Sequence, residues 1–60
     1  MNKPMVLIYS PTFGFLDGYD GDTYEWTPHK REAWRLREEE ALRRLPVVLN
    51  QAPDAVIQNL

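Results

Sequence analysis

The sequence predicts an α+β domain in which a small antiparallel β-sheet packs on one long helix, followed by a short helical C-terminal tail. Three observations predict this class: an apolar, β-rich segment near the N-terminus, two Asp-Gly pairs within six residues, and a helix-start signal ahead of a charged amphipathic segment. Because 60 residues suffice for only one small domain, residues 1–60 are expected to form a single unit.

The first expected element is a strand over residues 5–9, within a β-rich region that spans residues 1–27. The segment is apolar on both faces, which is typical of a strand buried on two sides. Pro4 and Pro11 flank it, and because proline lacks an amide donor both fit the ends of a strand.

A hairpin is expected next, with arms over residues 12–16 and 23–27 and a loop over residues 17–22. The loop holds both Asp-Gly pairs, and these favour turns because glycine accepts a positive φ and aspartate tolerates it. Alternation along the second arm places Tyr24 and Trp26 on one face.

The long helix is predicted over residues 28–45. Thr27 is a good N-cap, and Pro28 fits the first helical position, where its missing N–H costs nothing. The helix should stop or kink near Leu45, because Pro46 disfavours a helical residue before it. Its apolar stripe comprises Trp34, Ala41, Leu42 and Leu45, with Leu36 outside it, and its four-residue ion pairs are Glu39–Arg43 and Glu40–Arg44.

Residues 46–60 fit two descriptions. Residues 47–49 could form a short strand, but apolar residues also recur at three- and four-residue steps up to Leu60, which favours two short helices broken at Pro53. The core predicted from these elements comprises Val6, Ile8, Phe13, Phe15, Trp26, Trp34, Leu42, Leu45, Val48, Val56 and Leu60. A core this small gives a chain only a few kcal/mol of net stability, so a homodimer or a partner that completes it is a real alternative.

The composition excludes several classes of protein. There is no cysteine and one histidine, so disulfides, thiolate metal sites and cysteine nucleophiles are excluded. The net charge is −2 and the pI about 5.2, which disfavours a general nucleic-acid binder. No apolar segment approaches the roughly 20 residues of a membrane span. We expect a soluble cytoplasmic protein without a cofactor or a metal.

The acidic turn is the most distinctive feature. Four acids fall between Pro4 and His29 with no lysine or arginine, which gives that stretch a charge of −4. Carboxylates beside tyrosines can pair with the arginines and lysines of a basic surface. The expected partner-binding residues are Asp17, Tyr19, Asp20, Asp22, Tyr24 and Glu25. A solvated acidic turn that keeps an edge strand soluble is the competing interpretation.

Other chemistry finds little support in the sequence. A calcium loop that begins at Asp20 would need a carboxylate at its twelfth position, where Arg31 stands. His29 has no nucleophile placed with it by any motif, so we expect no enzyme. Lys30, Arg37 and Arg44 recur every seven residues, but three consecutive glutamates lie between them and would repel phosphate.

The function predicted from these features is a small non-enzymatic inhibitor that docks its acidic loop on a basic, nucleic-acid-binding surface of a larger protein. Small acidic cysteine-free proteins that begin with Met are commonly encoded by phages and mobile elements, as host-takeover or anti-CRISPR-like proteins. Two alternatives stay open. One is a homo-oligomeric structural or regulatory module, and the other is a nucleic-acid-binding regulator that uses its helix.

Overall fold

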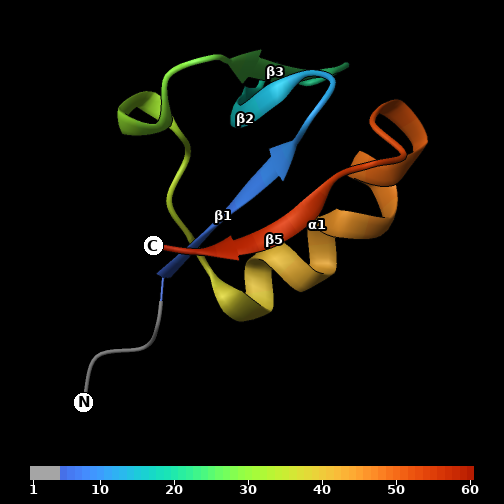
Figure 1. Ribbon diagram of the computed structural model, residues 1–60. Helices are drawn as coiled ribbons and strands as arrows, with labels where there is room; N and C mark the ends of the chain where they lie inside the picture. The colour runs from blue at the N-terminus through green and yellow to red at the C-terminus, as the bar shows by residue number, and fades with distance from the viewer. Residues whose placement is uncertain (1–4) are drawn as a thin grey trace.

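The computed structural model describes residues 5–60, which form an α+β domain with a five-stranded antiparallel sheet and one α-helix (Figure 1). The elements in chain order are β1 (Met5–Ser10), β2 (Gly14–Tyr19), β3 (Tyr24–Thr27), the short 3-10 helix η1 (Lys30–Glu32), β4 (Leu36–Arg37), α1 (Glu38–Gln51) and β5 (Val56–Asn59). The N-terminal strand agrees with the prediction, and a hairpin forms where one was predicted. Its first arm extends to Tyr19, however, so the loop covers residues 20–23 and not the predicted 17–22. Pro4, which was expected to flank the first strand, lies outside the described residues.

Strand β1 is the centre of the sheet. β5 runs along one of its edges, and β2 and β4 share the other, because Val6 pairs with Leu36 and Asn59 while Tyr9 pairs with Phe15 and Val56. Val6, Leu7 and Ile8 are fully buried although they alternate between the two faces of the sheet. The prediction of a strand buried on two sides is therefore confirmed.

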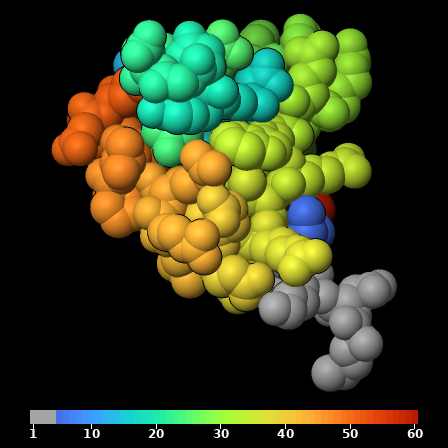
Figure 2. Space-filling model, turned by 180° about the vertical axis from the view of Figure 1, so that it is seen from behind, coloured from blue at the N-terminus to red at the C-terminus, as the bar shows by residue number. Residues whose placement is uncertain are grey.

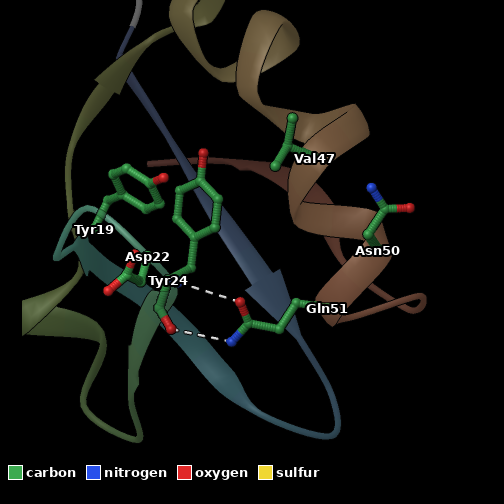
Figure 3. A pocket seen from close by; sticks show the side chains of 6 residues that line it. All are labelled: Tyr19, Asp22, Tyr24, Val47, Asn50 and Gln51. Atoms are coloured by element: carbon green, nitrogen blue, oxygen red, sulfur yellow. Dashed lines mark hydrogen bonds between the residues drawn. The ribbon is translucent and has the colours of Figure 1, made fainter.

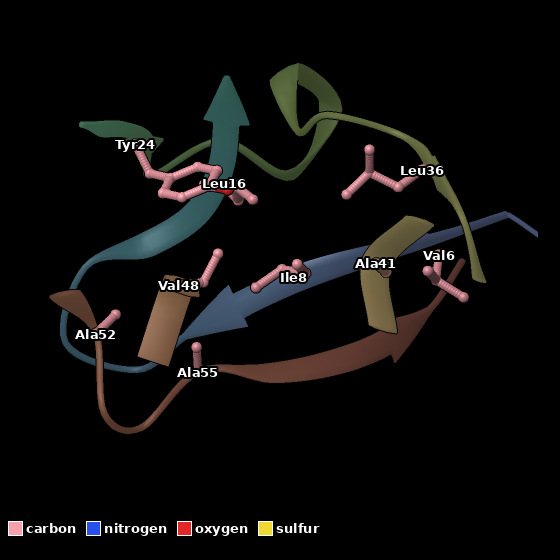
Figure 4. Packing of buried hydrophobic residues seen from close by; sticks show 9 residues of the cluster. All are labelled: Val6, Ile8, Leu16, Tyr24, Leu36, Ala41, Val48, Ala52 and Ala55. Atoms are coloured by element: carbon pink, nitrogen blue, oxygen red, sulfur yellow. The ribbon is translucent and has the colours of Figure 1, made fainter. Parts of the chain in front are cut away.

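The core lies between the sheet and α1 (Figure 4). Figure 4 shows Ala41 and Val48 of the helix pointing toward the strands, with Ile8 between them. The buried cluster comprises Val6, Ile8, Leu16, Tyr24, Leu36, Ala41, Val48, Ala52 and Ala55, and Trp26, Trp34, Leu45 and Ile57 pack against it. The predicted core is wrong at four positions whose side chains are exposed: Phe13, Leu42, Val56 and Leu60. Phe15 is half-buried and packs on Tyr9, with ring centroids 4.8 Å apart.

A β-bulge in β2 orients the hairpin. Between Leu16 and Gly18 the register with β3 shifts, so that two residues of β2 oppose one of β3. In a regular strand Leu16 and Tyr19 would face opposite sides, because they are three residues apart. The extra residue places Leu16 in the core and Tyr19 opposite the buried Tyr24.

The predicted helix over residues 28–45 is wrong at its start. Thr27 is buried and is not the N-cap of a helix. Its hydroxyl accepts a bond from the His29 amide at 3.2 Å and donates to Glu32 Oε1 at 2.7 Å, but the residue that precedes η1 as its N-cap is His29, which makes no side-chain cap hydrogen bond. Only the three residues of η1 are helical here, and Ala33 then turns extended with ψ 144°.

The physical reason is pairing with the sheet. The Trp34 amide donates to the Leu16 carbonyl at 2.8 Å, and Leu36 is buried in β4 beside Val6. Leu36 was the residue that did not fit the helical stripe, and a strand is the structure that buries it. The α-helix begins only at Glu38, where three glutamates in its first turn interact favourably with the helix dipole.

The predicted end of the helix and the helical tail are also wrong. α1 continues through Pro46 to Gln51, and the chain then turns into β5. Pro46 is exposed, so water can solvate the Leu42 carbonyl that would otherwise accept its N–H. Neither a strand at residues 47–49 nor a helix after Pro53 forms, because Val56–Asn59 instead pairs with four residues of β1.

Candidate functional site

A groove of about 240 Å³ lies where the hairpin loop meets α1. Tyr19, Asp22 and Tyr24 line it from the hairpin, and Val47, Asn50 and Gln51 from the helix. Figure 3 shows the two tyrosine rings side by side, with the helix residues across from them. Seen from behind, the cyan-green hairpin loop lies directly above the orange helix (Figure 2).

The two tyrosines of the groove have different roles. Their ring centroids are 4.7 Å apart with an interplanar angle of 41°. Tyr24 is 7% exposed, whereas Tyr19 is 46% exposed. The Tyr19 hydroxyl donates to the Gly21 carbonyl at 3.0 Å, which ties the ring to the loop. Tyr19 is therefore a fixed aromatic ring with one face free for a partner.

Asp20 organises the turn. Its Oδ1 accepts from the amides of Asp22 and Thr23, each at 2.9 Å, and its own amide donates to the Thr23 carbonyl at 3.1 Å. These amide donors, first Thr23 and then Asp22, lower the pKa of Asp20 below its usual value. Asp20 therefore shapes the loop through Oδ1 and also contributes its negative charge to the exposed surface.

Tyr24 is fixed by the helix. Gln51 Oε1 accepts from the Tyr24 amide at 3.2 Å, and Gln51 Nε2 donates to its carbonyl at 3.0 Å. Arg44 donates to the Tyr24 hydroxyl at 3.4 Å and to Glu40 at 2.7 Å, and its guanidinium lies 4.8 Å from the Trp34 ring centroid. The bond to Tyr24, followed by the one to Glu40, raises the pKa of Arg44. These contacts make Tyr24 a supporting residue.

The negative charge of the hairpin has no counter-ion within the described part of the chain. Asp17, Asp22 and Glu25 are exposed, and no ion pair joins any of the hairpin acids to a base among residues 5–60. The arginines of α1 are paired within the helix, where Glu40 contacts Arg44 and, at 3.1 Å, Arg43. An approaching cation would therefore meet a surface with uncompensated charge.

The structure brings together only part of the predicted partner-binding set. Tyr19, Asp22 and Tyr24 meet at the groove, whereas Asp17 is the extra residue of the bulge and Glu25 lies on the opposite face of β3 from Tyr24. Sequence reasoning missed the helix residues of the groove, which are Val47, Asn50 and Gln51. Their three- and four-residue spacing is typical of one helix face, and the sequence favours a short helix over these residues, but no local signal places that helix against the hairpin.

A second polar cluster holds the β1–β2 turn to the segment before β5. The Asp54 carboxylate accepts from the hydroxyls of Ser10, at 2.5 Å, and Thr12, at 2.6 Å, and from the Thr12 amide at 3.1 Å. The Ser10 hydroxyl also accepts from the Phe13 amide at 3.0 Å. These donors, the Ser10 hydroxyl first, lower the pKa of Asp54. Each side-chain oxygen of Ser10, Thr12 and Asp54 has a hydrogen-bond partner within the cluster, which indicates a structural role.

Comparisons with family models, with curated proteins and with solved structures find no match to this chain. Among residues 5–60 no three acidic or histidine side chains converge as they would around a metal ion. No helix in the described range is long and apolar enough to cross a membrane.

Proposed function

We propose that this chain is a small non-enzymatic protein-binding module that acts as an inhibitor. Its acidic hairpin loop and the adjoining groove dock on a basic, nucleic-acid-binding surface of a larger protein. One observation carries the proposal: a half-exposed Tyr19 and an unpaired Asp22 stand together at a groove, in a hairpin that has four acids and no base.

The composition of the groove supports a basic partner. An arginine or lysine side chain that entered it would lie against the Tyr19 ring and reach the Asp22 carboxylate. Val47 and Asn50 would bound it from the helix, one with apolar contact and one with an amide. Aromatic and charged groups around a small concavity are typical of the residues that contribute most to binding.

The stiffness of the loop supports the same proposal. Asp20 holds the amides of Asp22 and Thr23, and Tyr19 is bonded to Gly21, so the binding conformation exists before a partner arrives. A preorganised loop loses less conformational entropy on binding. Inhibition follows from the charge, because carboxylates on a phosphate-binding surface compete with nucleic acid for the same cations.

The test is a competition experiment with matched charge variants. The tagged protein is used to capture partners from a host lysate, and the captured protein is then titrated with nucleic acid and with salt. The charge variant is Asp17→Asn with Asp22→Asn, which leaves the Asp20 turn intact. The control is Glu38→Gln with Glu39→Gln, which removes the same charge from the start of α1. Circular dichroism checks that both variants fold.

The expected result is one basic nucleic-acid-binding partner whose nucleic acid competes with this protein. The charge variant should bind at least about tenfold more weakly and with a shallower salt dependence, while the control binds as wild type. A Tyr19→Ala variant should also bind more weakly. Equal binding and equal salt dependence for the charge variant and the wild type would overturn the proposal.

A further inference from the structure

Two edge strands of the sheet, β3 and β5, differ in how their outer main-chain groups are covered. At the β3 edge, Gln51 bonds both main-chain groups of Tyr24, and the charged Glu25 follows. At the β5 edge, every second residue directs its N–H and C=O away from β1, and these groups have no hydrogen-bond partner within residues 5–60. β5 is therefore an open edge, whereas the start of β3 is covered by a side chain of the helix.

The side chains of β5 do nothing to block pairing. Its sequence, Val-Ile-Gln-Asn, has no charge and no proline, and its pairing with β1 runs through four consecutive residues without a bulge. Natural edge strands usually carry at least one of these features to prevent association. Val56 is 51% exposed on this strand, and Leu60, which follows it, is 58% exposed.

A second apolar surface lies beside this edge, on α1. At about 100° per residue, Leu42 and Leu49 fall on one side of the buried line formed by Ala41 and Val48. The opposite side of the helix, which includes Gln51, faces the hairpin. β5 and the hairpin lie on opposite sides of β1 (Figure 1). Because the leucines are on the side of the helix opposite the one that faces the hairpin, they lie on the β5 side. They are 58% and 37% exposed.

We propose that a second copy of this chain docks here, with β5 pairing antiparallel to the β5 of the other copy about a two-fold axis. Such pairing continues the sheet across the interface and places both α1 helices on the same face. The leucine-bearing sides of the two antiparallel helices then face each other, so that Leu42 of one copy approaches Leu49 of the other. Strand hydrogen bonds and apolar helix contact therefore occur in one interface.

A second copy fits this surface better than a foreign strand for two reasons. First, β5 carries no charged side chain, so the two strands approach without charge repulsion. Second, Glu38 is the charged residue on the side of α1 that carries Leu42 and Leu49, and the two-fold axis places the two copies of Glu38 at opposite ends of the interface. A foreign strand would pair with β5 but would leave the leucines of α1 uncovered. Each copy uses its β5 edge in the two-fold pairing, so this contact joins two copies and leaves no further β5 edge on which a third copy could pair.

The interface is small, because β5 has only four residues. Interfaces below about 1,000 Å² are usually weak, so the dimer should form within the range from about 10 µM to about 1 mM. Sedimentation equilibrium over this range measures it. The disrupting variant is Leu42→Glu with Leu49→Glu, both exposed positions where the monomer tolerates a charge. The control is Val47→Glu, which places a charge on the other side of the same helix.

The expected result is an apparent mass that doubles with concentration for the wild type and for Val47→Glu, but not for Leu42→Glu with Leu49→Glu. Amide exchange in β5 should slow by at least about tenfold as the wild-type concentration rises. A wild type that stays monomeric at 1 mM, or a dimer that the leucine variant leaves intact, would overturn the proposal. Protection of the β5 amides only by an added foreign strand would also overturn it. The proposed partner surface is independent, since Val47→Glu alters the groove and spares the dimer.

Discussion

Gln51 of α1 acts as an extra strand residue for Tyr24, because its amide group bonds both the N–H and the C=O of that residue. Figure 3 shows the two parallel bonds. They join the end of the helix to the start of β3, and so they set the height of the hairpin above the helix. The groove depends on this pair, because Tyr24 lines it from the hairpin and Gln51 lines it from the helix.

The first prediction concerns this contact. Gln51→Ala leaves two main-chain groups at the buried Tyr24 without partners, which should lower the free energy of unfolding by about 1–3 kcal/mol. Asn50→Ala is the control, because Asn50 is exposed and should change stability by less than about 0.5 kcal/mol. Urea denaturation measures both. Equal stability of the two variants would show that water replaces the amide of Gln51 at no cost.

The second prediction concerns two glycines of β2. Gly14 has φ +102°, and a Cβ added there would lie 2.6 Å from the Thr27 carbonyl oxygen. Gly14→Ala should therefore destabilise the protein by about 1–3 kcal/mol. Gly18 has no atom within 4 Å of such a Cβ, so Gly18→Ala should be neutral or stabilise by up to about 1 kcal/mol. Thermal unfolding of the two variants measures these stabilities. If Gly18→Ala destabilised the protein as much as Gly14→Ala, this explanation would be contradicted.

The parts of the fold that follow from the sequence are those set by local rules. The uninterrupted apolar run of β1 and the Asp-Gly turn predict a buried strand and a hairpin, and both are present. The helix boundaries were wrong because long-range pairing decided them. Leu36 pairs beside Val6, and Val56 pairs beside Tyr9, and neither contact has a local signal.

In the candidate site, too, the residues set by local signals could be predicted and those set by long-range contacts could not. The exposed Tyr19 and Asp22 could be named from the turn and the charge pattern alone. The roles of Asp20 and Tyr24 as supporting residues required the hydrogen bonds of the loop and of Gln51. The helix half of the groove is not predictable in the same way: the sequence favours a helix between Pro46 and Pro53, but no local pattern places that helix against Tyr24.

The third prediction concerns acid stability. The folded-state pKa values of Asp20 and Asp54 are lowered by hydrogen bonds to their carboxylates. Such groups add stability above the unfolded-state pKa of about 3.9, and this stability is lost as the pH falls through the lower folded-state values. The urea midpoint should be constant down to about pH 5 and should fall below about pH 4.

Two variants test whether these two carboxylates cause the fall in the urea midpoint at low pH. Asp54→Asn and Asp20→Asn should each lower the midpoint at pH 7 and flatten its fall at low pH. Asp17→Asn is the charge control, because it removes one carboxylate while the hydrogen bonds of the loop, which Asp20 accepts, stay in place, and the fall should persist. If the urea midpoint of both Asp54→Asn and Asp20→Asn still falls at low pH as it does in the wild type, other groups cause the acid sensitivity.

The last prediction is that Pro46 destabilises the helix in which it lies. Proline in a helix interior costs about 3 kcal/mol relative to alanine, because it removes a hydrogen bond and crowds the preceding turn. Its rigidity in the unfolded chain offsets about 0.4–1 kcal/mol of this cost. Since Pro46 is exposed and its replacement opens no cavity, Pro46→Ala should stabilise the protein by about 1–2 kcal/mol. The control Val47→Ala should gain no more than about 0.7 kcal/mol from helix propensity. Urea denaturation compares the two, and a loss of stability in Pro46→Ala would mean that the proline ring makes packing contacts that outweigh its cost to the helix.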